Sequence, residues 1–288
     1  LGYGMMDKSE GREAEEELRK AKRTLRELGR ANPRIKASIS AHSAYMCSEE
    51  LVVKAKELAN EEGLLFQMHV SETREEVFNI LSEKKMRPVQ YLESLGVVDS
   101  LSLFSHMGWV TKKEIEIAGK GGANVAHCPV SSLKLGVGDI APISEFMENG
   151  ANVCLGTDGP ASNNSLNMLE SMKMGLLLQS HKYWDPSRFT VGQAWDCATL
   201  NGAKALGIHA GEISPGKLAD LAIADAKAAN LKPLPADLRL IAYSISPLNI
   251  TDVIIDGKFV MREGHIEFVD EELVAEKAED VAKEIMER

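Results

Sequence analysis

The sequence lacks the features that mark membrane, secreted and disulfide-stabilised proteins. Its longest apolar stretches, such as residues 174–178 and 221–224, are far shorter than the roughly 20 residues that a membrane-spanning helix needs. The first seven residues have neither a basic start nor an apolar segment, so we expect no secretory signal. The four cysteines are scattered and form no C-x-x-C pair, which is typical of reduced thiols. We therefore predict a cytoplasmic protein without a membrane segment.

Motifs for nucleotide cofactors and for serine nucleophiles are also missing. The chain has no Gly-x-Gly-x-x-Gly that opens a helix, no Walker loop and no Gly-x-Ser-x-Gly. Acidic residues outnumber basic ones: the chain has 43 Asp and Glu and 33 Lys and Arg, which gives a formal net charge of −10. This acidity is spread along the chain, which argues against nucleic acid or an anionic membrane as a partner. The composition is compatible with small neutral or cationic ligands.

What the chain does contain is an alternation of short β-rich segments with amphipathic stretches, which is typical of a parallel sheet with crossover helices. The predicted strands are residues 2–7, 36–41, 64–70, 102–105, 123–126 and 152–156. The predicted helices are residues 10–29, 49–62, 73–84, 111–120, 143–148, 165–179 and 190–206. We expect Gly29 to end the first helix. The 288 residues allow one large α/β barrel with a small appendage, or two ordinary domains.

The pattern changes near residue 207. Beyond it the residues alternate in polarity, and the pair Asp256-Gly257 is typical of a hairpin turn. We therefore predict three parts: a barrel-type domain over residues 1–206, a small β unit over 207–266, and a charged helix over 267–288.

Polar residues stand at or just beyond the carboxyl ends of five predicted strands. They are His42, His69, His106, His127 and Asp158, separated by 27, 37, 21 and 31 residues. In a parallel barrel these ends face one mouth, so residues that are distant in the sequence converge in space. Imidazoles and a carboxylate around one cavity suit a divalent metal, with hydrolysis as the chemistry.

Each of these residues also has a purely structural interpretation. A single histidine at such a position is more often a half-buried, hydrogen-bonded side chain than a ligand. Glu72, three residues after His69, is placed to shuttle a proton beside a metal, but it also suits the N-terminus of the following helix. Asp158 also suits an Asx turn. We interpret His181 as a surface residue, and Cys128 has no partner base that would make it a nucleophile.

Five motifs contain the strand-end residues. They are His42-Ser-Ala-Tyr-Met-Cys, His69-Val-Ser-Glu-Thr, Ser105-His-Met-Gly-Trp, His127-Cys-Pro-Val-Ser-Ser and Gly156-Thr-Asp-Gly-Pro. Together they resemble the amidohydrolase superfamily, and within it the 5′-methylthioadenosine/S-adenosylhomocysteine deaminases and the 5′-deoxyadenosine deaminases. The resemblance runs along nearly the whole chain. It implies an α/β fold, a (β/α)8 TIM barrel of the metal-dependent hydrolase type, present here as strands three to eight, plus part of a small β-sandwich domain.

The resemblance also implies a catalytic apparatus. His69 and Asp158 would bind one divalent metal, zinc or iron, and Asp158 would in addition accept a proton and contact the substrate. Glu72 would hydrogen-bond a ring nitrogen of the purine and protonate it. His106 would stabilise the attack on the carbon that bears the amino group. The implied reaction is hydrolytic deamination of an adenosine-type nucleoside to the inosine analogue and ammonia.

Further implied roles concern the substrate and the assembly. His42 would contact the nucleoside, and Arg12 would lie near the tail of the substrate. A neutral purine nucleoside needs no basic groove, in agreement with the acidic composition. We also expect a homo-oligomer.

The chain departs from the family in a few places. The family has Pro where Ala44 stands, and commonly Asn where Cys128 and Ser132 stand. Its His-x-His motif, which supplies two metal ligands, is absent from this sequence. The two remaining ligands fall short of the three usual for catalytic zinc, so we expect the chain to be the C-terminal two-thirds of an enzyme.

Three alternatives stay open. One is another amidohydrolase activity, of the guanine deaminase or triazine hydrolase type, which would use similar strand ends. Another is a catalytically inactive fragment that serves as a binding or assembly module, which the missing His-x-His favours. The third, a metal-storage protein, would call for clustered Cys and His tracts that this sequence lacks.

Overall fold

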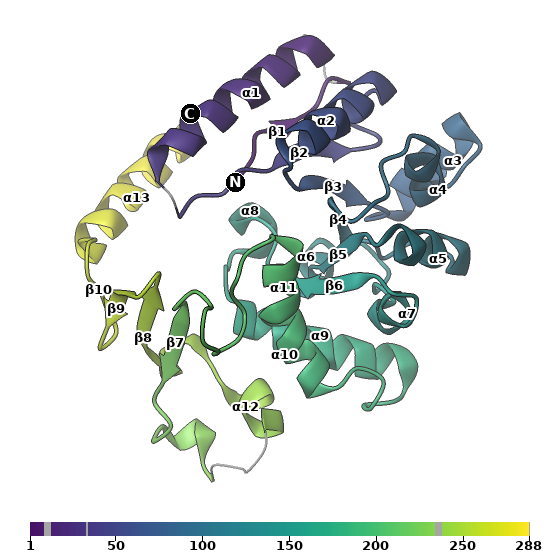
Figure 1. The fold of residues 1–288 in the computed structure, drawn as a ribbon. Helices are drawn as coiled ribbons and strands as arrows, with labels where there is room; N and C mark the ends of the chain where they lie inside the picture. The colour runs from purple at the N-terminus through teal and green to yellow at the C-terminus, as the bar shows by residue number, and fades with distance from the viewer. Residues whose placement is uncertain (9–12, 33, 234–237, 288) are drawn as a thin grey trace. The chain divides into compact units, whose positions relative to one another are not determined.

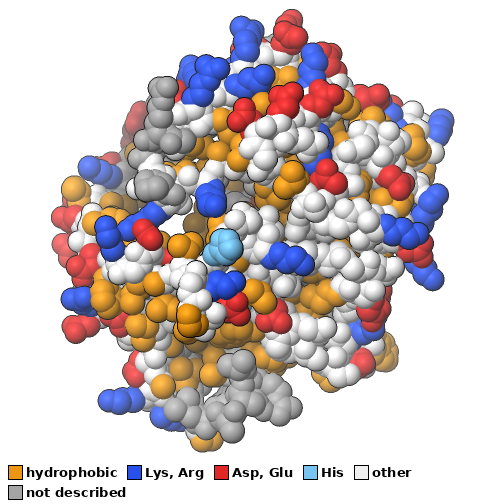
Figure 2. Space-filling view, in the orientation of Figure 1, with side chains coloured by type: hydrophobic (Ala, Val, Ile, Leu, Met, Phe, Trp, Pro, Cys, Tyr) orange, Lys and Arg blue, Asp and Glu red, His pale blue; other side chains and the backbone are white. Residues whose placement is uncertain are grey.

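The chain forms two compact units, Leu1–Gly211 and Glu212–Arg288 (Figure 1). A computed structural model describes residues 1–8, 13–32, 34–233 and 238–287. Within these ranges, none of the helices combines the length and the apolar content that a membrane crossing requires. Acidic and basic side chains intermingle on the face shown in Figure 2, so the net charge of −10 is not gathered into one patch there.

The first unit is built on a six-stranded parallel sheet whose strands follow one another in chain order. The strands are β1 (Gly4–Met5), β2 (Ile39–Ser43), β3 (Phe66–Val70), β4 (Ser102–His106), β5 (Asn124–His127) and β6 (Asn152–Leu155). Helices follow the strands along the chain and lie on the outside of the sheet (Figure 1). The prediction of an α/β fold with a parallel sheet is therefore confirmed.

The helices of the first unit match the predicted ones in most places. They are α1 (Ala14–Ala31), α2 (Glu49–Glu62), α3 (Arg74–Lys84), α4 (Pro88–Ser94), α5 (Lys112–Gly121), α6 (Pro129–Leu135), α7 (Ile143–Glu148), α8 (Pro160–Asn163), α9 (Met168–Tyr183), α10 (Val191–Ala198) and α11 (Leu200–Ala205). The expectation that Gly29 ends the first helix is wrong, because α1 continues to Ala31. The helix ends before Asn32, which precedes a proline in the sequence, and that position disfavours helical backbone.

The prediction of a single helix over residues 190–206 is also wrong, because the structure has two helices there, α10 and α11, separated at Thr199. The start of α11 is attached to the edge of β6. The side-chain amide of Asn201 donates a hydrogen bond to the Val153 carbonyl at 2.8 Å, and the Asn201 carbonyl accepts one from the Asn152 side chain at 3.0 Å. The first bond satisfies a backbone carbonyl that an edge strand otherwise leaves open.

Alternation along the strands decides which side chains face the site. In β2 and β3 every second residue is buried under the helices, and the residues between them, among them His42 and His69, are only partly buried. The buried positions of β3 hold large apolar side chains such as Phe66, which is fully enclosed, as is Phe104 of β4. The register of β3 and β4 pairs His69 with Ser105 and brings the two strands to an end side by side.

The second unit contains a four-stranded antiparallel sheet in the order β10, β9, β8, β7. Its elements are β7 (Leu221–Ala224), η1 (Ala229–Leu231), α12 (Leu238–Ser244), η2 (Pro247–Asn249), β8 (Ile250–Ile255), β9 (Lys258–Arg262), β10 (His265–Ile266) and α13 (Glu271–Met286). Asp256 and Gly257 connect β8 to β9 with positive φ at both positions, as a tight hairpin turn requires. The predicted small sheet of hairpins is therefore present.

Candidate active site

Three imidazole rings from neighbouring strands lie in a row at one end of the parallel sheet. The ring centroids of His42 and His69 are 4.7 Å apart, and those of His69 and His106 are 5.4 Å apart. Both pairs are stacked, with interplanar angles of 30° and 19°. His106 and the following Met107 adopt positive φ, of 72° and 53°, so the chain turns sharply at the end of β4. The structure thus brings together three histidines that lie up to 64 residues apart in the sequence.

The tautomer of His69 follows from its hydrogen bond. Its Nδ1 lies 2.8 Å from the backbone carbonyl of His42, and a carbonyl oxygen can only accept, so Nδ1 carries the proton. The lone pair of His69 is therefore on Nε2. A histidine oriented in this way through its second nitrogen is the arrangement commonly found in metal ligands.

Glu72 and His106 face each other beside this row. Oε1 of Glu72 is 3.8 Å from Nε2 of His106, and the Glu72 side chain is only 15% exposed. Burial raises the pKa of Glu72, and the negative charge of Asp158 adds to this, although His69 opposes it. Burial lowers the pKa of His106 to about 4, helped by repulsion from His69, so this imidazole is uncharged at neutral pH. Neither ring nitrogen of His106 has a hydrogen-bond partner among the described residues.

Asp158 lies just after β6 in a turn with a φ of 61°. Its Oδ2 accepts a hydrogen bond from the Ser131 hydroxyl at 2.6 Å, and its Oδ1 accepts one from the Gly159 amide at 2.7 Å. Burial works against the charged form, but these bonds and the nearby His106 and His69 outweigh it and lower the pKa of Asp158. Asp158 is therefore ionised at neutral pH. It shares a cavity of about 330 Å³ with His69.

A second cavity, also of about 330 Å³, is lined by His106. Glu72 and His127 line it as well, together with Gly108, residues 132–133 and 136–141, and two side chains of α9. His181, which we interpreted as a surface residue, is exposed but also lines this cavity. His127 is 2% exposed, and its Nε2 has no hydrogen-bond partner among the described residues. Burial lowers the pKa of His127 to about 3, with smaller contributions from His106 and Lys182.

Because His127 is buried uncharged, we expect acid to destabilise the fold. The ordinary pKa of His127 is 6.5 and its folded value is about 3, so the unfolded chain binds the proton first. Its contribution to stability is complete above pH 6.5 and is lost as the pH falls towards 3. Between about pH 7 and about pH 5 this amounts to about 2 kcal/mol.

Urea unfolding of the parent and of His127→Asn at these two pH values tests this expectation. The variant should lose about 2 kcal/mol less than the parent on acidification. The matched control is His209→Asn, which replaces an exposed histidine. We expect this variant to keep the pH dependence of the parent. Equal losses in the parent and in His127→Asn would show that His127 does not carry the effect.

Some residues near the site could not be singled out from the sequence. Ser131 belongs to the motif that begins at His127, but only the structure shows that its hydroxyl holds Asp158. Burial raises the pKa of the Cys128 and Cys154 thiols, that of Cys154 to about 12, so both stay protonated and are poor nucleophiles. Arg12, assigned to the substrate tail, lies outside the described residues.

The fit of a metal ion is decided by the donors at hand. Among the described residues, no group of three or more His, Cys, Asp or Glu side chains could hold a metal ion. Two donors are available in one cavity: the free Nε2 of His69 and the ionised carboxylate of Asp158. Both suit zinc or iron, since neutral imidazole and carboxylate are common ligands of these metals. The described residues therefore fit part of a metal site, one ligand short of the three usual in catalytic zinc centres.

Comparisons with known proteins show the family of this chain. The model of the amidohydrolase family matches residues 1–260. A 5′-deoxyadenosine deaminase from Methanothermobacter thermautotrophicus is 38% identical over 286 residues, which are 99% of this chain and 67% of that protein. A 5-methylthioadenosine/S-adenosylhomocysteine deaminase from Pyrococcus abyssi is 35% identical over 283 residues, 98% of this chain and 66% of that protein.

A solved structure of a related fold superposes on this chain. An adenosine deaminase from Xanthomonas campestris with bound zinc superposes with a TM-score of 0.94 at 27% identity. The match covers 100% of this chain and 66% of that chain. This chain thus spans about two thirds of the length of the relatives it matches.

Proposed function

The chain belongs to the amidohydrolase family, and from this membership we propose that it deaminates adenosine-type nucleosides by hydrolysis. The substrates would be 5′-methylthioadenosine, S-adenosylhomocysteine or 5′-deoxyadenosine, and the products the inosine analogue and ammonia. The observation that carries the proposal is the Glu72 carboxyl, 3.8 Å from a buried His106 whose ring nitrogens have no hydrogen-bond partner among the described residues. A carboxyl and an uncharged imidazole at the wall of one cavity are suited to moving a proton onto and off a heterocycle.

Each side chain then has a distinct role. Glu72 hydrogen-bonds a ring nitrogen of the purine and protonates it, which makes the carbon that bears the amino group more electrophilic. His106 is uncharged and stabilises the attack of water on that carbon. Asp158, held ionised by Ser131 and Gly159, accepts a proton from the attacking water and contacts the substrate. Proton transfer of this kind typically contributes roughly 10²- to 10⁴-fold to a rate.

A divalent metal belongs to this proposal. We assign zinc, with iron as the alternative, to His69 and Asp158, the two donors that line one cavity among the described residues. When bound, such a metal lowers the pKa of a water towards about 7 and makes it nucleophilic at neutral pH. His42 would contact the nucleoside, and Arg12 would lie near its tail.

Family membership also suggests how the strands of this chain correspond to those of a complete barrel. We propose that β1 to β6 correspond to strands three to eight of a (β/α)8 barrel over residues 1–206. Residues 207–266 would form part of a small β-sandwich domain, and residues 267–288 a terminal helix. Short edge strands and the Asn201 bonds to β6 agree with a sheet that is only part of a closed barrel. A homo-oligomer remains a prediction.

The test is an assay of the chain with equimolar zinc or iron. We expect 5′-deoxyadenosine, methylthioadenosine or S-adenosylhomocysteine to release ammonia, with the ultraviolet shift from adenine to hypoxanthine. Guanine and a chlorinated triazine are the comparison substrates. Turnover of guanine or triazine alone would replace the nucleoside assignment by the corresponding hydrolase activity.

A second candidate is a catalytically inactive chain that binds or assembles. The incomplete donor set favours it, because the described residues supply two metal ligands and no group of three. Binding of a nucleoside measured by calorimetry, without ammonia release at saturating zinc, would identify this state. Ammonia release above a control without protein would rule it out.

A further inference from the structure

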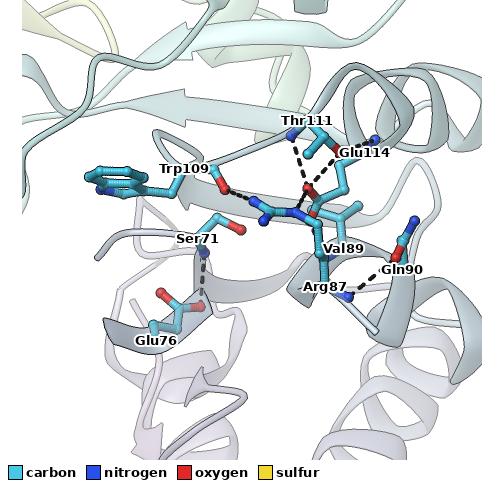
Figure 3. A network of polar contacts seen from close by, with 8 residues as sticks. All are labelled: Ser71, Glu76, Arg87, Val89, Gln90, Trp109, Thr111 and Glu114. Carbon is cyan, nitrogen blue, oxygen red and sulfur yellow. Dashed lines mark hydrogen bonds and ion pairs between the residues drawn. The ribbon is translucent and has the colours of Figure 1, made fainter. Parts of the chain in front are cut away.

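The turn that carries Glu72 is held by a second glutamate. Ser71 has a positive φ of 52°, so the backbone leaves β3 in a left-handed turn before Glu72. Glu76 of α3 points back at this turn, as Figure 3 shows for its contact with Ser71. Its Oε1 accepts a hydrogen bond from the Ser71 amide at 2.8 Å, and its Oε2 accepts one from the Glu72 amide at 2.7 Å. Each oxygen thus serves one amide of the turn.

The other side of the turn is held by β4 and the segment that follows it. The Ser71 carbonyl accepts a hydrogen bond from the Trp109 amide at 2.9 Å. The Trp109 carbonyl in turn accepts one from Arg87 Nη2 at 2.5 Å, and Arg87 Nε donates to Glu114 at 2.6 Å (Figure 3). Ser71 is therefore fixed through both its amide and its carbonyl.

Capping of the helix explains only part of this use of Glu76, because the N-cap amide of Thr73 contributes less to holding its charge than the amides of Ser71 and Glu72. At α5 the glutamate in the corresponding position, Glu114, closes a capping box and accepts a hydrogen bond from the Thr111 amide at 2.9 Å. At α3 the cap is Thr73, whose hydroxyl accepts from the Glu76 amide at 3.1 Å. The Glu76 carboxylate reaches further back, to the turn that carries Glu72.

Burying the Glu76 carboxylate costs stability unless its oxygens accept hydrogen bonds. Glu76 is 2% exposed, and burial raises its pKa to about 7 although the backbone amides oppose the shift. A carboxylate enclosed to this degree is stable only when its oxygens are hydrogen-bonded. The two amides of the turn and the two oxygens of Glu76 therefore depend on each other.

We propose that Glu76 is a positioning residue, which fixes the left-handed turn after β3 and thereby sets the Glu72 carboxyl beside His106. The consequence for turnover rests on the proposed function, whereas the order of the turn does not. Displacing a reacting group by about 1 Å costs on the order of 10²-fold in rate.

The test compares three variants of the full chain. Glu76→Gln keeps the shape but has one acceptor oxygen, so one of the two amides meets an NH2 group instead. Glu76→Asp keeps both acceptors on a shorter side chain. Glu75→Gln, which removes an exposed charge from the adjacent position of the same helix, is the matched control. All are measured about two pH units above the pKa of Glu76, where the carboxyl is ionised.

Amide exchange is the readout that does not depend on activity. In Glu76→Gln we expect the amides of Ser71 and Glu72 to exchange at least about 10-fold faster than in the parent, because one acceptor is lost. Exchange of Phe104 in β4 should be unchanged, and Glu75→Gln should match the parent throughout. If Glu76→Gln does not fold, Glu76→Asp is measured in its place, with a smaller acceleration at the same two amides.

Activity supplies the second readout. We expect kcat for the nucleoside to fall by roughly 10- to 100-fold in Glu76→Gln while KM changes little, and Glu76→Asp to recover part of kcat. Unchanged exchange at Ser71 and Glu72 would overturn the proposal, as would a kcat loss of equal size in Glu75→Gln. A parent without deaminase activity would count against the proposed function alone, because the exchange experiment still decides whether Glu76 orders the turn.

Discussion

Glu72→Gln is expected to lower kcat/KM for deamination of 5′-deoxyadenosine by roughly 10²- to 10⁴-fold. Glutamine has nearly the volume of glutamate and can still hydrogen-bond a purine, but it cannot deliver a proton to a ring nitrogen. The loss should therefore fall on kcat, with nucleoside binding by calorimetry reduced far less. Steady-state rates from the ultraviolet change of the base give the measurement.

The neighbouring carboxyl provides the control for this substitution. Glu75→Gln makes the same chemical change three residues further along the chain, on the exposed side of α3, and should keep the parental rate. A loss of less than about 3-fold in Glu72→Gln, well below the range for general acid catalysis, would remove Glu72 from the proton transfer.

The second large effect concerns metal binding. We expect His69→Ala to abolish zinc binding at the site, with a fall in affinity greater than the roughly 100-fold that losing an outer-shell partner can cost. His69 is one of two donors, and its Nε2 is the one that the bond to the His42 carbonyl leaves free. Calorimetric titration with zinc at neutral pH measures the change.

Two comparisons make the zinc experiment decisive. His265→Ala removes an exposed histidine of the second unit and should leave the affinity unchanged. If His69→Ala retains the parental affinity, the ion binds elsewhere on the chain.

Periodicity and turn chemistry were enough to predict most of the fold. The parallel strands, α2 and α7, and the Asp256-Gly257 hairpin follow from patterns that are local in the sequence. One error, at Gly29, came from overlooking the local Asn32-Pro signal, and the other lies beside contacts that are distant in the sequence. The break at Thr199 lies next to the bonds between Asn201 and β6, which have no signature in a helical pattern.

The candidate site could be predicted to a similar extent, because the ends of parallel strands must lie together. This rule alone places His42, His69 and His106 near one another, and the structure shows them stacked in a row. Interactions between side chains and the backbone of a turn could not be predicted. Glu76 lies within the sequence Thr73-Arg-Glu-Glu, which is typical of a capping box, and only the folded chain shows its carboxylate on the amides of Ser71 and Glu72.

The left-handed backbone at Ser71, His106, Met107 and Asp158 has a consequence for how this protein can be stabilised. Such positions cost on the order of 1–3 kcal/mol each when the residue is not glycine, against a total stability of roughly 5–15 kcal/mol. Ser71 adds a buried hydroxyl without a hydrogen-bond partner among the described residues. Selection for heat resistance alone would therefore favour glycine at Ser71, and the gain in melting temperature would come at the expense of order in the turn that carries Glu72.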